Sequence, residues 1–157
     1  MCHYCGCRQI PLIRDYIAEH ARATEAGDSC LRAVTRGDLT EARRQLDLMA
    51  AELQSHWDGE EKGIFTVMSA RDEMYADYVA PLVVEHRELA ALLARIDLAS
   101  PDDVAELWTA VHELAEHISK EEDGIFPVTL TELSGPEWDR AIAAWQAAHP
   151  GQELIAD

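Results

Sequence analysis

A ten-residue motif occurs twice in the chain, 61 residues apart, and places polar side chains on two otherwise apolar helical faces. The copies read HWDGEEKGIF and HISKEEDGIF, so both follow the pattern H-x-x-x-E-E-x-G-I-F. Steps of three and four residues extend each copy into a stripe with one His and one Glu among apolar residues. The two stripes are Leu46, Met49, Leu53, His56, Glu60, Ile64 and Val67, and Leu107, Ala110, Leu114, His117, Glu121, Ile125 and Val128. Any fold of this chain has to bury both stripes together with their polar members.

A second repeat precedes each copy of this motif. The segment IAEH at residues 17–20 corresponds to VVEH at residues 83–86, a spacing of 66 residues. Each segment belongs to a further apolar stripe with one imidazole, His20 in the first and His86 in the second. The chain therefore consists of two similar halves, and each half contributes a His and then a His-x-x-x-Glu pair.

Helical periodicity covers almost the whole sequence, in which Gly and Pro are sparse, at 8 and 6 residues. Start and stop signals predict a first helix from Pro11 toward Gly37 and a second from Asp38 to about Ala70. A third begins at or passes through Pro81 and ends near Ala99. The remaining two are a fourth over about 100–133 and a short last helix over about 134–149, which opens with a capping box. Short connections make neighbouring helices antiparallel, so we expect an all-α, up-down-up-down four-helix bundle with a short C-terminal helix.

The composition is that of a globular protein with one main domain. Its 157 residues include 13 Lys and Arg against 30 Asp and Glu, a net charge of -17 that disfavours nucleic acid and anionic membranes and favours cations. No apolar run approaches the roughly 20 residues of a membrane span, and no secretory signal is recognisable, so we expect a cytoplasmic protein. We expect a Cys-rich N-terminal segment over 1–9, the bundle over 10–133, and the C-terminal helix and tail over 134–157.

The two stripe carboxylates point to a metal site. Burying Glu60 and Glu121 as free carboxylates in a core would cost several kcal/mol of free energy for each. No Lys or Arg lies on the stripes to pair with them. A cation accepts carboxylates and neutral imidazoles together. Four imidazoles and two carboxylates are too many for one tetrahedral zinc but suit two metals with bridging carboxylates. Mixed ligation of this kind favours non-haem iron over manganese or zinc.

Each His and Glu of the stripes, taken alone, could have a structural role in place of metal ligation. A lone His on an apolar face is usually a hydrogen-bonded core residue, and one His-x-x-x-Glu pair is common by chance. Four such His and two Glu in matched halves argue against that explanation. His112 and Glu116 form a competing pair, but His112 lies about 140° around the helix from His117, so we expect it at the surface or between helices.

The order H, HxxxE, H, HxxxE, with E-x-G-I-F-P after the second pair, resembles the hemerythrin-like (HHE cation-binding) family over about residues 10–133. The resemblance implies a pair of non-haem iron ions joined by an oxo or hydroxo bridge. It assigns His20 and His56 to one iron, His86 and His117 to the other, and bridging roles to Glu60 and Glu121. A protein of this kind binds or reacts with dioxygen, peroxide or nitric oxide.

The sequence departs from the oxygen-carrying hemerythrins at one ligand. Those proteins have a fifth His one helical turn from another, whereas the positions one turn from His86 are Leu82 and Ala90. Glu121 also lies four residues after its His, as in the HHE members, where the oxygen carriers have an Asp at spacing five. Both irons are then coordinatively open, which favours redox or sensing chemistry over purely reversible oxygen carriage. A non-catalytic iron, oxygen or redox sensor and a metal-stabilised structural bundle stay open as alternatives, as does whether the protein is an enzyme.

Tyr16 and the N-terminal cysteines each have three possible roles. Tyr16, where the second half has Leu82, is expected to hydrogen-bond a bound oxygen species, to ligate one iron, or to be an ordinary core residue. Cys2, Cys5 and Cys7 form C-x-x-C-x-C, a candidate zinc site, a redox switch, or a tail without a role.

Flanking residues complete the expected surroundings. The four glutamates beside the ligand residues either orient imidazole N–H groups or form a solvated acidic face; they are Glu19, Glu61, Glu85 and Glu122. We expect packing roles for Trp57 and Trp108, and we expect Phe65 and Phe126 to keep the site dry. Beyond a small diatomic or peroxide ligand, the redox partner is undefined, and a monomer and a homodimer both fit.

Overall fold

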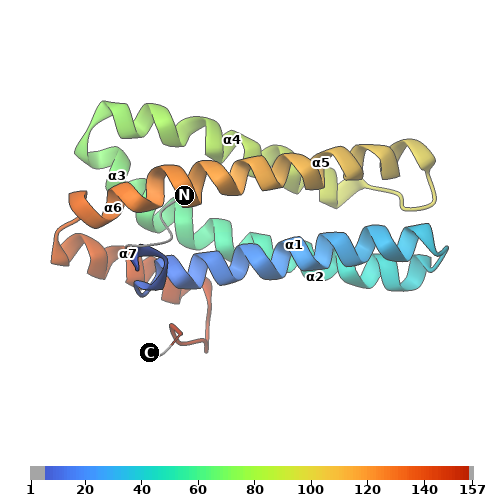
Figure 1. Cartoon of the computed structure of the whole chain (residues 1–157), viewed down its shortest axis with the longest axis horizontal. Helices are drawn as coiled ribbons and strands as arrows, with labels where there is room; N and C mark the ends of the chain where they lie inside the picture. The colour runs from blue at the N-terminus through green and yellow to red at the C-terminus, as the bar shows by residue number, and fades with distance from the viewer. Residues whose placement is uncertain (1–5, 156–157) are drawn as a thin grey trace.

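The start and stop signals of the sequence account for the observed elements. A computed structural model describes residues 6–155, which form helices and no strand. In chain order the elements are the 3₁₀ turn η1 (Cys7–Gln9), α1 (Ile13–Thr35), α2 (Leu39–Glu60), the π-helical turn η2 (Glu61–Phe65), α3 (Thr66–Arg71), α4 (Glu73–Arg95), α5 (Pro101–Lys120), the π-helical turn η3 (Glu121–Ile125), α6 (Phe126–Glu132) and α7 (Gly135–Ala148). The predicted all-α bundle with a C-terminal helix is confirmed (Figure 1).

Side-chain caps begin the helices at the predicted places. Asp38 accepts a hydrogen bond from the Glu41 amide at 3.1 Å, and Ser100 accepts one from the Asp103 amide at 3.3 Å. The third helix begins at Glu73 and passes through Pro81. Pro81 lies exposed, so water can solvate the carbonyl group that its missing N–H leaves unbonded.

The two sequence halves form two helical hairpins. Gly37, at φ 74°, makes the turn between α1 and α2. α4 and α5 form the second hairpin, which packs against the first through the pairs α1 with α5 and α2 with α4. α7 packs on α2 and η2, at the end of the bundle where η3 also lies (Figure 1). No helix among residues 6–155 is long and apolar enough to cross a membrane.

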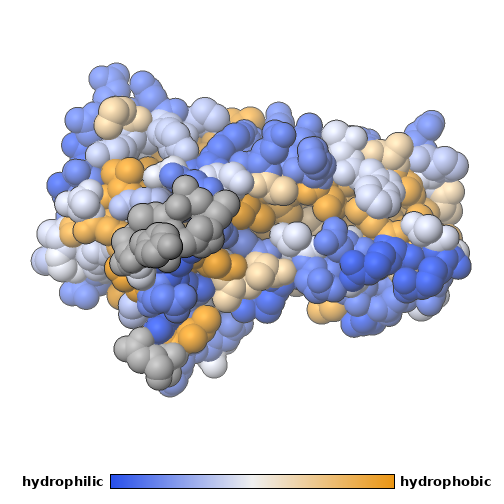
Figure 2. All heavy atoms as spheres, viewed as in Figure 1, coloured by the Kyte–Doolittle hydropathy of each residue, from blue (hydrophilic) through white to orange (hydrophobic). Residues whose placement is uncertain are grey.

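A layer of buried polar residues divides the core into two apolar clusters. One cluster lies toward the α1–α2 and α4–α5 connections and includes Cys30, Leu46, Met49 and Leu107. The other lies toward α7 and includes Tyr16, Phe65, Leu82, Phe126 and Trp145. On every long helix the polar residues fall between the two clusters. The outer surface is mostly hydrophilic, with apolar side chains visible along the seam between α5 and α1 (Figure 2).

Exposure of individual side chains confirms most expectations and corrects one. Cys30 is fully buried in the core, where it packs as a small apolar residue. Trp108, expected to pack, is 55% exposed, so that expectation was wrong. The reason is its register, because the adjacent Leu107 occupies the inward position and leaves the indole in a surface groove that it lines with Leu31 and other residues of α1.

Each copy of the ten-residue motif ends in a π-helical turn. Such a turn holds one extra residue, so the residues before and after it can both face the core. In η2 the glycine of the motif has a non-helical backbone, with Gly63 at φ -100° and ψ -107°. A Cβ atom there would lie 3.1 Å from the carbonyl oxygen of Ala141 in α7. The absence of a side chain at Gly63 thus allows α7 to approach η2.

We expect Gly63→Ala to lower the free energy of unfolding by about 1–3 kcal/mol, because backbone atoms of α7 must move to admit the methyl group. Urea denaturation measures the change. Gly135→Ala is the matched control, since no atom lies within 4 Å of its Cβ position. Equal stability of the two variants would contradict close packing of α7 on η2.

Candidate metal centre

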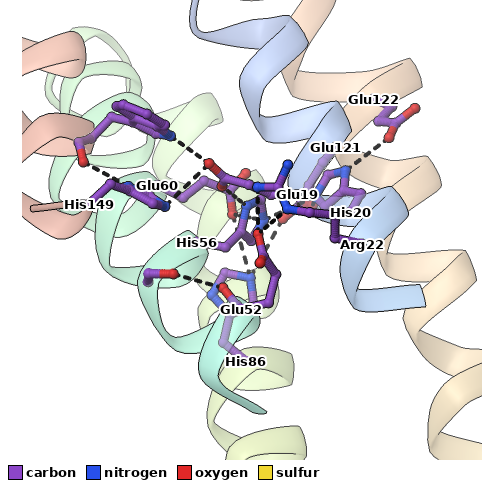
Figure 3. A network of polar contacts seen from close by, with 12 residues as sticks. Glu19, His20, Arg22, Glu52, His56, Glu60, His86, Glu121, Glu122 and His149 are labelled. Atoms are coloured by element: carbon purple, nitrogen blue, oxygen red, sulfur yellow. Dashed lines mark hydrogen bonds and ion pairs between the residues drawn. The ribbon is translucent and has the colours of Figure 1, made fainter. Parts of the chain in front are cut away.

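Six buried side chains from the two hairpins meet in the polar layer, and none is more than 5% exposed. They are His20 of α1, His56 and Glu60 of α2, His86 of α4, His117 of α5 and Glu121 of η3. These are the residues that the repeat singles out. Figure 3 shows several of them pointing toward one another from different helices.

The first cluster contains His20, His56, Glu60 and Glu121. The Nε2 atoms of His20 and His56 are 3.0 Å apart. Oε2 of Glu121 lies 3.1 Å from Nε2 of His20, and Oε2 of Glu60 lies 3.3 Å from Nε2 of His56. One potential ligand atom from each residue lies within 4.8 Å of the others, which is a suitable spacing to hold one metal ion.

The second cluster contains His86, His117 and again Glu121. The two Nε2 atoms are 2.9 Å apart, and Oε1 of Glu121 lies 2.8 Å from Nε2 of His117. Glu121 thus offers one oxygen to each cluster. Glu60 belongs to the first cluster, and its Oε2 is 3.8 Å from Nε2 of His86. Two clusters that share a carboxylate are consistent with a site for two metal ions.

Each imidazole also meets a second glutamate at its outer nitrogen. The Nδ1–carboxylate distances are 2.9 Å for His20 with Glu122, 2.8 Å for His56 with Glu19, 2.9 Å for His86 with Glu61 and 2.7 Å for His117 with Glu85. All four flanking glutamates therefore orient imidazole rings, one of the two possibilities that the sequence left open. An ionised carboxylate only accepts, so each Nδ1 donates, and Nε2 of the neutral ring presents a lone pair to the centre.

The centre of the layer consequently gathers acceptors without donors. None of the four carboxylate oxygens of Glu60 and Glu121 has a hydrogen-bond partner. No Lys or Arg of residues 6–155 pairs with either carboxylate. Buried lone pairs and negative charges of this kind require a cation. The residues present therefore fit a pair of metal ions.

Protons can supply positive charge in place of metal ions. The pKa values of the buried histidines show how strongly the neighbouring carboxylates favour a bound proton. Burial lowers the pKa of His117, but the carboxylates of Glu121 and Glu85 outweigh it and raise the pKa to about 8. Burial likewise opposes protonation of His56, yet Glu60 and Glu19 hold its pKa well above the usual value. Metal ions and protons therefore compete for the same lone pairs.

Aromatic side chains enclose the layer. Trp57 and Phe65 stack on His86, with ring centroids at 5.0 and 5.9 Å, and Phe126 stacks on His20 at 6.0 Å. Trp57, Phe65 and Phe126 are all buried, which agrees with their expected roles. These rings separate the ligand atoms from water on the apolar sides of the layer.

Tyr16 is fully buried beside the first cluster. Its ring meets His56 edge-on at 5.4 Å, and its hydroxyl has no hydrogen-bond partner. Burial raises the pKa of the phenol well above its usual value, and the nearby carboxylates of Glu60 and Glu19 raise it further. The hydroxyl thus stays protonated, with its hydrogen available to donate.

Three residues outside the repeated motifs also reach the outer carboxylates and escaped the sequence analysis. Trp145 of α7 donates from Nε1 to Oε1 of Glu19 at 2.6 Å, and Nε2 of His149 lies 3.2 Å from the same oxygen. Arg8 of η1 pairs with Glu122. Their distance along the chain from the repeat leaves no spacing signal that could have found them.

The structure places two further residues that the sequence analysis considered, His112 and Cys7. His112 is exposed, as expected, and Cys7 is buried in η1. Cys2 and Cys5 lie outside the described residues, so the proposed zinc site there is not tested. Among residues 6–155 the candidate metal clusters contain no cysteine.

Comparison with known families agrees with this geometry. The sequence matches the Hemerythrin HHE cation binding domain over residues 12–129. The chain belongs to this family. The matched range of this HHE domain contains all six residues of the two clusters and ends before α7. Searches of curated proteins and of solved structures gave no significant match.

The register of the centre can be tested by two histidine variants on α5. We expect His117→Ala to lower the bound metal from two ions per chain to one or fewer, because it removes a ligand of the second cluster. His112→Ala should retain both ions, since that side chain is exposed. Elemental analysis after dialysis measures the ratio, and metal loss in the His112 variant alone would refute the register.

Metal affinity should also depend on pH. An imidazole with a raised pKa carries a proton below that pKa, and the metal must displace it. We expect the apparent dissociation constant for Co²⁺ to rise about tenfold per pH unit as the pH falls below about 8. Calorimetric titrations at pH 6, 7 and 8 measure it, and an affinity constant across that range would contradict competition with protons.

Proposed function

We propose that this HHE-domain chain is a non-haem di-iron protein that binds or reacts with dioxygen, peroxide or nitric oxide. The observation that carries the proposal is the Glu121 carboxylate, which lies between two pairs of buried imidazoles. Imidazole and carboxylate together suit iron better than they suit a structural zinc, which prefers four ligands that close its coordination.

In this proposal the role of each residue follows from its position in the polar layer. His20 and His56 would hold one iron and His86 and His117 the other, and Glu121 and Glu60 would supply carboxylate ligands. The outer glutamates hold the rings in place and increase the basicity of Nε2. Iron bound here supplies redox electrons and Lewis acidity.

The protein ligands leave room for a small exogenous ligand. The positions one turn from His86 hold Leu82 and Ala90, so α4 contributes one imidazole and no second one. Leu82 is buried at 1% exposure beside the aromatic rings. An apolar, dry surrounding with unused ligand positions favours a small, weakly charged molecule such as dioxygen, peroxide or nitric oxide over a large anionic substrate.

Tyr16 supplies the donor that the centre otherwise lacks. Its buried hydroxyl makes no hydrogen bond, and its raised pKa keeps the proton on the phenol. We propose that this hydroxyl donates to the small ligand. Replacement by Phe removes the donor and leaves the ring contacts with His56 and Phe126 in place.

A second candidate function is a non-catalytic sensor. The contacts from Trp145 and His149 to Glu19 connect the first cluster to α7, and metal binding stabilises a fold with so many buried acceptors. Metal binding at the centre would then change the position or stability of α7, which a partner that binds α7 could detect. Tight iron binding with a large gain in melting temperature and without turnover would favour this function over the first.

The proposal is tested by loading the protein anaerobically with ferrous iron and then admitting air. We expect two irons per chain and a new near-ultraviolet charge-transfer absorption of the oxidised pair, both lost in Glu121→Ala. Tyr16→Phe should keep both irons but consume peroxide or nitric oxide about tenfold more slowly or worse, because a positioned proton donor is missing. An absorption spectrum that air leaves unchanged would refute the di-iron proposal.

A further inference from the structure

The two halves of the metal centre differ in how far solvent reaches them. The outer carboxylates of the first cluster are shielded, with Glu19 1% and Glu122 12% exposed. Those of the second cluster are open, with Glu61 30% and Glu85 34% exposed. The inner ligands are similarly buried in both clusters, so the difference lies in the surrounding shell.

Segments beyond the repeated helices close the first cluster. Oε1 of Glu19 receives the Trp145 indole N–H and faces Nε2 of His149, and the two rings stack at 4.3 Å. Figure 3 shows the contacts that lead from His149 through Glu19 to His56. Arg8 pairs with Glu122 on the other side of this cluster. α7 and η1 therefore lie between solvent and the outer glutamates of the first cluster.

A groove leads to the second cluster. A cavity of about 410 Å³ lies between α4 and α5, and its lining includes His86, His117 and the indole of Trp57. Its carboxylates are Glu85, Glu88, Glu106, Glu113 and Glu116, against the single cation Lys120. Glu85 pairs with Lys120, and Glu106 pairs with Arg95.

The three other carboxylates of the groove, on Glu88, Glu113 and Glu116, make no ion pair with a described residue. They are exposed, and the groove ends at two buried imidazoles whose Nε2 atoms face the centre. A hydrated divalent cation drawn to these charges meets His117 and His86 without displacing a helix. The groove thus combines attraction for cations with an approach to the two imidazoles of the second cluster.

We propose that this groove is the route by which divalent metal enters and leaves, so that the ion held by His86 and His117 exchanges while the ion held by His20 and His56 is locked. This inference rests on the dimetal part of the proposed function and is independent of the reaction. It concerns the order and rate of loading, which the identity of the small ligand does not affect.

Release of Co²⁺ to excess EDTA tests the inequivalence of the two positions. Protein loaded with two equivalents should lose them in two phases of equal amplitude, followed by the visible d–d absorption, with rates that differ about tenfold or more. His117→Ala should abolish the fast phase and His20→Ala the slow phase. Trp145→Phe with His149→Gln should accelerate the slow phase alone.

Two surface variants test the path itself. Thr109 lines the groove and is exposed, so Thr109→Trp should block the groove and slow the fast phase. Thr131→Trp, exposed on α6 and outside the groove, is the matched control and should leave both phases unchanged. These changes avoid the ligands, so a folding defect in a ligand variant does not decide the outcome.

The acidic residues are tested by the rate of Co²⁺ loading at low ionic strength. The triple variant Glu88→Gln, Glu113→Gln, Glu116→Gln should load about tenfold more slowly. The matched control is Glu73→Gln, Asp77→Asn, Asp139→Asn, which removes three exposed charges outside the groove. Slowing by both triples to the same extent would assign the effect to net charge and overturn the route.

The outcomes separate this inference from the function on which it rests. Release of both ions at one rate, or a fast phase that Thr109→Trp does not slow, overturns the groove proposal and leaves a dimetal centre standing. Binding of fewer than two ions by the unmodified chain overturns the dimetal proposal itself.

Discussion

The structure depends on one electrostatic constraint, the convergence of four imidazole lone pairs and two carboxylates whose oxygen atoms have no hydrogen-bond partner. Each outer glutamate fixes a proton on Nδ1 and thereby turns Nε2 inward as an acceptor. An apolar core cannot hold such a group of atoms without a cation. The positions of the helices, the π-helical turns and the surrounding aromatic rings all serve to keep these atoms together and water away.

The polar layer also explains why the bundle has two apolar clusters instead of one. On each long helix the ligand residues interrupt the apolar stripe, and packing resumes on the other side. The π-helical turn η2 follows Glu60 directly and η3 begins at Glu121, and at the end of each turn two consecutive apolar residues are buried, Ile64 with Phe65 and Ile125 with Phe126. The irregular backbone thus lies where residues on two adjacent faces of the helix are both buried.

Much of this arrangement was predictable because it is encoded at short range. The stripe register identified the six inward residues and excluded His112, and the caps at Asp38 and Ser134 located helix starts. Contacts between distant segments could not be read in this way. Trp145 and His149 reach Glu19 because Gly63 lets α7 lie close. The exposure of Trp108, by contrast, follows from the short-range register, because its neighbour Leu107 takes the inward position.

Outer hydrogen bonds cross between the two halves of the chain. Two of the four do so: Glu61 of the first hairpin holds His86 of the second, and Glu122 of the second holds His20 of the first. The other two, from Glu19 to His56 and from Glu85 to His117, stay within one half. The centre therefore has an approximate two-fold symmetry, and two copies of a single such hairpin, related by a two-fold axis, would present the same six inner and four outer groups. The features that break this symmetry are Tyr16, α7 and η1. Whatever distinguishes one metal position from the other is thus an addition to a symmetric framework.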